Sequence, residues 1–131
     1  SPYAQTQCPD LILSEHSTWK RIYLHRMKHS KICIASTGLH QSSGWKIAEY
    51  LAAGRAIVSE PLCYEVPGPF QAGENYLTYT SADGCIEQIR TLLAHPEQIL
   101  QMGQRNRAYY DEWLRPDQIV TKALEQAKIL L

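Results

Sequence analysis

The sequence predicts an α/β fold, in which a parallel sheet of three to four strands is flanked by helices and further helices follow at the C-terminal end. Short apolar runs recur at residues 31–35, 56–59 and 76–79. Continuous apolar runs of this length are typical of parallel strands that are covered on both faces. Segments with helical spacing of apolar residues separate these runs, and a chain of 131 residues suits one domain.

The first predicted helix follows an irregular N-terminal segment. Residues 1–9 contain two prolines and several polar residues, which favours an irregular lead-in. Residues 10–13 are expected to form a short strand or a loop that packs against the body. Ser14 is a suitable N-cap for a helix that continues to about Lys28. Apolar residues recur on this helix at helical spacing, at Trp19, Ile22, Tyr23 and Met27.

The middle of the chain predicts a strand, a polar loop, a helix and a second strand in succession. Polar residues 36–43 follow the run at 31–35, so they lie at the carboxyl end of a predicted strand. Open α/β sheets bind ligands at this edge. The helix after the loop is expected to have Ser43 as its N-cap, to span about Gly44 to Ala53, and to be followed directly by Gly54. Trp45 is expected to anchor this helix in the core, the alternative being that it forms a wall of the site.

The C-terminal half predicts a long loop, a last strand and three helices. Residues 60–75 hold three prolines and two glycines, and loops of this length are often functional. Ser81 is a suitable cap for a helix that ends at His95, and a second helix starts near Pro96. Pro116 separates the second helix from the last one. Three aromatic residues near the end of the second helix are expected to pack in the core: Tyr109, Tyr110 and Trp113.

Composition narrows the classes of function. A formal net charge of zero gives no basis for nucleic-acid binding. No apolar run approaches the roughly 20 residues that a membrane-spanning helix needs. The four cysteines form no C-x-x-C pair, and the five histidines are not placed at zinc-ligand spacing with them. We therefore expect no metal ion, no cofactor, and a reducing, cytoplasmic setting.

The polar loop and the helix after it carry the candidate site. Backbone N–H groups at a helix N-terminus suit a phosphate group, and three loop residues could present such groups or hydroxyls: Ser42, Ser43 and Gly44. The same three residues could equally serve only to cap the helix. Lys46 is expected either to pair with the phosphate or to form an ion pair with Glu49 one turn later. Glu49 offers acceptors for two sugar hydroxyls, or it is a solvated helix glutamate.

The same segment carries a family resemblance. Glu49 and residues 51–58 resemble the donor-binding motif in the C-terminal domain of GT-B glycosyltransferases. Gln41 stands where many retaining members have a first glutamate, so the chain departs from the motif there. Together with residues 73–79, the segment is most similar to a divergent glycosyltransferase group related to a spore-maturation protein. The resemblance extends over roughly residues 20–115.

This resemblance implies the donor-binding domain of a glycosyltransferase. The fold would be a partial Rossmann-like domain, and residues 1–131 would be the C-terminal part of a longer protein whose upstream lobe binds the acceptor. The donor would be a nucleoside diphosphate sugar, and the acceptor a glycan, a lipid or a protein. Transfer of a hexosyl group would need no metal, in agreement with the absence of an Asp-x-Asp sequence. The isolated chain would be inactive because half of its site is missing.

The resemblance also assigns roles to individual residues. Glu49 would hold the ribose, residues 42–46 would hold the diphosphate, and Gln41 would contact the transferred sugar. A glutamine cannot take a proton, so Gln41 also fits a non-catalytic α/β module that binds a nucleotide or a partner protein. Two further kinds of association are possible. One is self-association through the exposed edge of a partial sheet, and the other is peripheral association of the full-length protein with a membrane.

Overall fold

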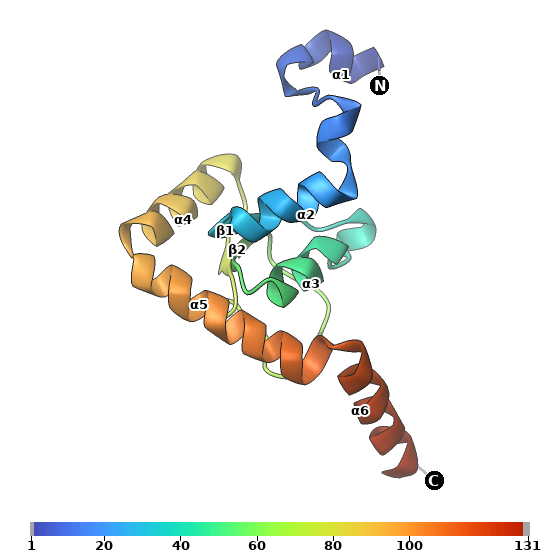
Figure 1. The fold of residues 1–131 in the computed structure, drawn as a ribbon. Helices are drawn as coiled ribbons and strands as arrows, with labels where there is room; N and C mark the ends of the chain where they lie inside the picture. Colours follow the sequence, from blue (N-terminus) through green and yellow to red (C-terminus); the bar gives the residue numbers. More distant parts are fainter. Residues whose placement is uncertain (1, 130–131) are drawn as a thin grey trace.

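A short parallel sheet forms the centre of the structure (Figure 1). The computed structural model describes residues 2–129, and within them three strands lie in the order β1-β2-β3: β1 (Ile32–Ala35), β2 (Ala56–Ser59) and β3 (Leu77–Thr78). Both pairings are parallel, and in the first of them Cys33 lies opposite Ile57. The predicted α/β class and the three predicted strands are therefore confirmed.

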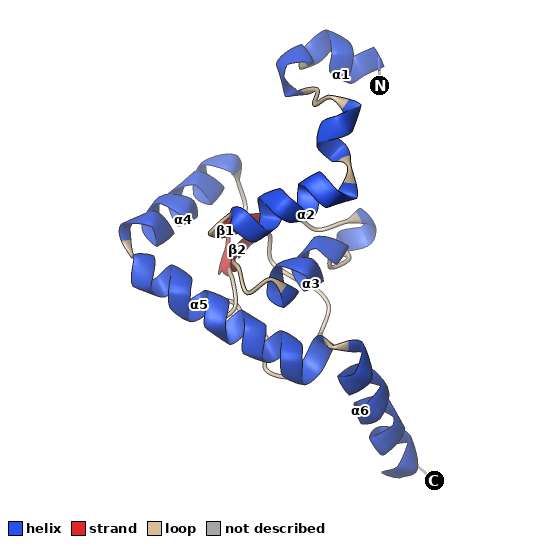
Figure 2. Ribbon diagram, viewed as in Figure 1, coloured by secondary structure: helices blue, strands red, loops and turns tan. Residues whose placement is uncertain are grey.

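Helices make up most of the remaining chain, as Figure 2 shows. The longer ones are α2 (Lys20–His29), α3 (Trp45–Ala52), α4 (Ala82–Ala94), α5 (Pro96–Tyr109) and α6 (Pro116–Ile129). A π-helical turn, Tyr110–Leu114, joins α5 to α6. Proline begins both α5 and α6, a position where its missing N–H group costs nothing. The predicted helix boundaries at Pro96 and Pro116 are confirmed.

The core consists of two clusters on opposite faces of the sheet. Ile57 of β2 packs with Leu51 of α3 in one cluster, whereas Val58 packs with Leu92 of α4 in the other. Alternate residues of a strand face opposite sides, so successive residues of β2 reach both clusters. Helix α5 contributes to both, through Tyr109 to the first and Met102 to the second. The predicted aromatic packing is confirmed, since Tyr110 and Trp113 pack against the first cluster.

The turn between α3 and β2 forms as the sequence predicts. Gly54 adopts a left-handed backbone with φ 61°, the conformation that favours glycine directly after a helix. The next residue, Arg55, donates from Nε to the Ala53 carbonyl at 2.7 Å and from Nη1 to the Lys28 carbonyl at 3.1 Å. Arg55 therefore satisfies carbonyl groups at the ends of two helices. It lies at the amino end of β2, at the sheet edge opposite the candidate loop.

The N-terminal segment differs from the prediction. Residues 2–7 form a short helix, α1 (Pro2–Gln7), and a 3-10 turn at Pro9–Leu11 replaces the expected strand or loop. Ser14 does not cap the long helix. Its Oγ lies 2.8 Å from Ser17 Oγ and makes no hydrogen bond to a helix N–H group. Trp19 has a non-helical backbone with φ −57° and ψ 136°, so α2 begins only at Lys20.

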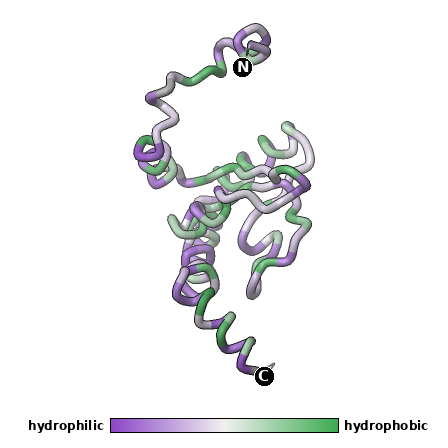
Figure 3. Tube along the Cα trace, turned by 90° about the vertical axis from the view of Figure 1, so that its right-hand side faces the viewer, coloured by the Kyte–Doolittle hydropathy of each residue, from purple (hydrophilic) through white to green (hydrophobic). Residues whose placement is uncertain are grey.

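Both ends of the described chain project from the body. Helix α1 and the 3-10 turns after it lead away at one end, and α6 leads away at the other (Figure 1). Figure 3 shows hydrophobic and hydrophilic stretches alternating along the projecting α6. Ile119, Val120 and Leu124 of this helix are exposed. The packed body that positions the candidate site is therefore built from the elements α2 to α5 and the sheet.

Candidate functional site

The candidate loop occupies residues 36–44, between the carboxyl end of β1 and the start of α3. Gln41, Ser42 and Ser43 are exposed, and Gly44 is half-buried. The N-cap of α3 is Gly44, so the expectation that Ser43 caps the helix is wrong. Glycine has no side chain, so the N-cap residue accepts no side-chain hydrogen bond from the first turn of α3, and no other side chain in the described part of the chain replaces it. The N-terminal N–H groups of this helix thus have no side-chain acceptor of their own.

Two consecutive loop residues have an unusual backbone. His40 and Gln41 adopt φ values of 56° and 60°, in the left-handed region where residues other than glycine are strained. The sharp turn is held by a hydrogen bond from the Gly38 N–H group to the Ser42 carbonyl at 2.8 Å. Tyr64 of the long loop donates its hydroxyl to the His40 carbonyl at 3.1 Å. Residues 60–75 therefore support the candidate loop from outside.

A carboxylate after β2 holds the base of the loop. Glu60 Oε2 accepts hydrogen bonds from the Thr37 backbone N–H group and from Thr37 Oγ1, each at 2.7 Å. These two hydrogen bonds hold the pKa of Glu60 below its usual value. The Tyr79 hydroxyl donates to the Ala35 carbonyl at 2.9 Å and joins β1 to the chain after β3. The carboxyl ends of the three strands are thus linked by side chains.

We expect Glu60→Gln to destabilise the protein in a pH-dependent way. The folded-state pKa of Glu60 is lowered, so its ionised form contributes stability above the ordinary pKa of a glutamate and loses it as the pH falls through the folded-state value. Chemical unfolding of both proteins from pH 7 to pH 3 measures this. The difference in unfolding free energy should shrink at the acid end, and an exposed control, Glu87→Gln, should show no such trend. A difference that stays constant over the whole range would contradict the role of the ionised carboxylate.

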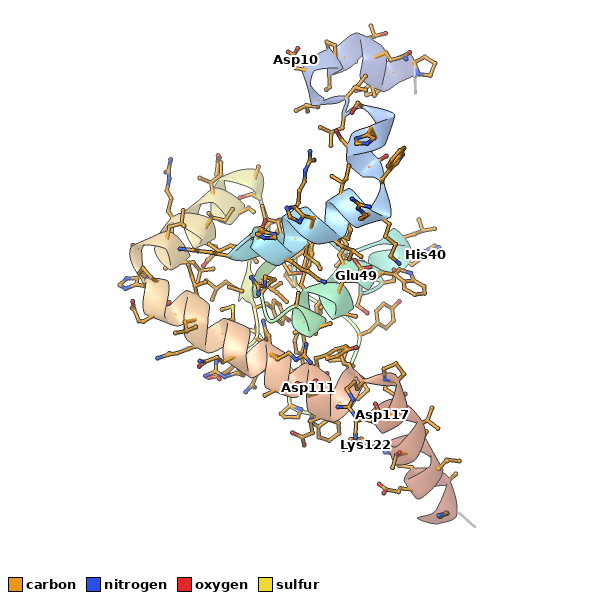
Figure 4. All side chains as sticks on the ribbon, in the orientation of Figure 1. Asp10, His40, Glu49, Asp111, Asp117 and Lys122 are labelled. Carbon is orange, nitrogen blue, oxygen red and sulfur yellow. The ribbon has the colours of Figure 1, made fainter. Side chains whose placement is uncertain are left out.

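Glu49 lies half-buried on α3, facing α2. The Tyr23 hydroxyl donates to Glu49 Oε2 at 2.8 Å. The alternative ion pair between Lys46 and Glu49 is absent from the described residues, and the Lys46 side chain is exposed. In Figure 4 the labelled Glu49 and His40 lie on the same side of the body. The structure therefore places the six predicted residues, 41–44, 46 and 49, along one continuous stretch from the loop into α3.

The exposed position of Trp45 contradicts the core position expected for it. It was predicted to anchor α3 in the core, but it is 93% exposed. Helix α3 buries Ile47, Tyr50 and Leu51, and Trp45 projects from a different side of the helix. An apolar cavity of about 230 Å³ opens beside α3, with Ser43, Gly44 and Trp45 on its wall and with Leu62, Val66 and Phe70 contributed by the long loop. Trp45 thus borders a cavity that adjoins the start of α3.

A larger hollow lies elsewhere. A volume of about 770 Å³ opens at the opposite edge of the sheet, around Gly54, Arg55 and Gly103, and none of the six predicted residues lines it. Arg55 and Arg107, which border it, are engaged with backbone carbonyls and with Asp111. We place the candidate site at the loop because polar groups converge there at the carboxyl ends of the strands, where such sheets bind ligands. Within residues 2–129, no cluster of three metal-ligating side chains occurs.

Sequence reasoning missed Tyr23, Thr37 and Tyr64 as partners of the site. Tyr23 was counted only as part of the apolar stripe of its helix. Its contact with Glu49 joins residues 26 positions apart and depends on how α2 packs against α3. Spacing within a helix predicts which residues share a face, but it does not predict which helix that face meets.

Comparisons with known proteins give one result. A family model described as glycosyl transferase-like matches residues 9–125 of the chain. No curated protein and no solved structure gives a significant match. In the part of the chain that the structure describes, no helix is both long and apolar enough to cross a membrane.

Proposed function

Because this chain belongs to the glycosyl transferase-like family, we propose that it is the donor-binding domain of a GT-B glycosyltransferase. The domain holds a nucleoside diphosphate sugar for transfer to a glycan, lipid or protein acceptor that another lobe of the protein binds. One observation carries the proposal. The start of α3 lies at the carboxyl end of the sheet with no side-chain cap, and a carboxylate, Glu49, follows just after its first turn.

The diphosphate binds at the start of α3. Its first N–H groups have no side-chain acceptor, and the helix dipole places partial positive charge there. Ser42 and Ser43 are exposed beside these groups and can donate hydroxyl hydrogen bonds. Lys46 is exposed and forms no ion pair among the described residues, so its ammonium group is available to the phosphates. These groups would stabilise the negative charge that develops on the departing diphosphate.

The sugar groups of the donor bind on either side of the phosphates. Glu49 accepts hydrogen bonds from the ribose hydroxyls, since an ionised carboxylate presents only acceptors. Gln41 offers a neutral amide to the transferred sugar from the strained turn of the loop. The apolar cavity beside Ser43 and Gly44 provides a wall next to the phosphate position. Holding the donor in one orientation is the main contribution that such a domain makes to catalysis.

Calorimetric titration with the four common ribonucleoside diphosphates tests the proposal. We expect one of them to bind, and Glu49→Ala to weaken that binding about ten- to hundredfold, the range for losing a hydrogen bond to a charged group. Glu87→Ala is a matched control, because Glu87 is exposed on α4, which covers the other face of the sheet. Equal affinities of the native protein and the Glu49→Ala variant would rule out the ribose contact. Failure of all four nucleotides to bind would argue against a donor site.

A second candidate function is a non-catalytic nucleotide-binding module. The observation that favours it is Gln41, an exposed amide where the related motif has a glutamate. The two functions separate in a transfer assay on the longer protein, which includes the acceptor-binding lobe, with a labelled nucleotide sugar and mixed acceptors. Release of the nucleoside diphosphate together with a labelled product supports the enzyme. Tight nucleotide binding without turnover supports the module.

A further inference from the structure

A tyrosine on a neighbouring helix holds the carboxylate of Glu49. Tyr23 lies at the end of the first turn of α2, and its hydroxyl donates to Glu49 Oε2 at 2.8 Å in a partly buried setting. A hydrogen bond to an ionised acceptor is stronger than one between neutral groups. Tyr23 is therefore the side chain that decides how the Glu49 carboxylate is oriented.

The hydroxyl group of Tyr23 is a dependable donor. Burial, followed by the hydrogen bond to Glu49, raises the pKa of Tyr23 well above its usual value, so the hydroxyl keeps its proton. The neighbouring Tyr50 is itself anchored, since its hydroxyl donates to the Ile34 carbonyl at 3.2 Å. The surroundings of Tyr23 are thus fixed by α3 and by β1.

The hydrogen bond from Tyr23 engages only one oxygen of the Glu49 carboxylate. Among the described residues, no hydrogen bond or ion pair involves Glu49 Oε1. A glutamate on a helix has three rotatable side-chain bonds, and a free one samples many orientations. Because Tyr23 holds Oε2, the positions that Oε1 can reach are restricted before any ligand arrives.

We propose that Tyr23 is a positioning residue for nucleotide recognition, which orients Glu49 so that Oε1 accepts a hydrogen bond from a ribose hydroxyl. This inference rests on the proposed function and adds a residue to its site. Tyr23 does not touch the ligand itself. It lowers the entropic cost of binding, because the carboxylate is already ordered.

The rival explanation is that the hydrogen bond only joins α2 to α3. Loss of a purely structural contact would lower the stability of the protein just as loss of a positioning contact would. It would not, however, change the affinity for one ligand more than for another. The difference between ribose and deoxyribose is therefore the informative readout. A positioning role predicts an effect of Tyr23 only for ligands that carry the hydroxyl that Glu49 recognises.

The experiment compares Tyr23→Phe with the native protein in titrations with the best-binding ribonucleoside diphosphate and its 2′-deoxy and 3′-deoxy forms. We expect the variant to bind the ribonucleotide about three- to tenfold more weakly, as for the loss of one hydrogen bond. Its affinity for the deoxy form that the native protein binds least well should stay unchanged. Tyr110→Phe is the control, because Tyr110 packs against the same core cluster, does not line the cavity at the start of α3, and forms no hydrogen bond with Glu49 among the described residues.

The Glu49→Ala background gives a second readout. There, Tyr23→Phe should have no further effect on affinity, because the residue that it orients is gone. Thermal unfolding of each variant confirms that it is folded. Native binding that favours ribose, together with an unchanged preference in Tyr23→Phe, would overturn this inference and leave the proposed function standing. Absence of nucleotide binding by the native protein would overturn both.

Discussion

Replacing Gly103 with alanine should destabilise the protein by about 3 kcal/mol, although alanine normally favours a helix over glycine by about 1 kcal/mol. Gly103 lies inside α5 and is buried against the turn that follows α3. A Cβ atom at this position would lie 2.6 Å from the Gly54 carbonyl oxygen. That oxygen is backbone, and the turn is fixed by a hydrogen bond from the Gly54 N–H group to the Leu51 carbonyl at 3.0 Å. Helix α5 would have to move away from α3.

Thermal and urea unfolding measure this effect. For a chain of this size we expect a fall in Tm of roughly 10 °C. Gln104→Ala is the matched control, since it changes the next residue of the same helix at an exposed position. We expect the control to unfold within about 0.5 kcal/mol of the native protein. A Gly103→Ala protein as stable as the control would show that the two segments can separate without loss of packing.

Replacing Asn106 with alanine should cost about 3 to 5 kcal/mol, because it leaves several buried polar groups without partners. Asn106 is fully buried on α5. Its Nδ2 donates to the Arg55 carbonyl at 2.8 Å and to the Asn75 carbonyl at 2.9 Å, and its Oδ1 accepts from Asn75 Nδ2 at 3.1 Å. Asn75 Oδ1 in turn accepts from the Gln71 N–H group at 3.1 Å. This network attaches the end of the long loop to α5.

The neighbouring Arg105→Ala provides the comparison. Arg105 forms an ion pair with Glu74 at 2.9 Å in which both side chains are about half exposed, and such pairs contribute at most about 1 kcal/mol. Denaturant titration of both variants should therefore separate them clearly. Equal destabilisation would mean that the buried amide network contributes no more than a surface ion pair, contrary to our expectation.

The sequence predicted the elements that local chemistry controls. Pro96 and Pro116 begin helices because proline lacks an N–H group, and Gly54 ends α3 because it adopts a left-handed backbone at little cost. The three apolar runs form strands, but only β2 is buried at every position as expected for a strand covered on both faces, whereas Ile34 of β1 is 48% exposed. The N-terminal segment was predicted less well, since Ser14 bonds to a neighbouring side chain and Trp19 interrupts the helix.

The surroundings of the candidate site were predicted only in part. Residues 41–44, 46 and 49 remain predicted site residues, and they could be proposed because a polar loop after a strand and a carboxylate on the next helix are features of the chain itself. Trp45 was misplaced because a large apolar side chain at the start of a helix can face either the core or solvent. The cavity beside it exists only because the loop at 62–70 folds against α3.

The sequence by itself determined the order of the main strands and helices, the loop that carries the candidate site and the family to which the chain belongs. The tertiary structure alone decided which side chains meet. Glu49 is held by Tyr23, Thr37 by Glu60, and Asn75 by Asn106. The partners in these pairs stand 23 or more positions apart in the chain. Local propensity acts over a few residues, whereas contacts at this separation depend on how whole elements pack around the sheet.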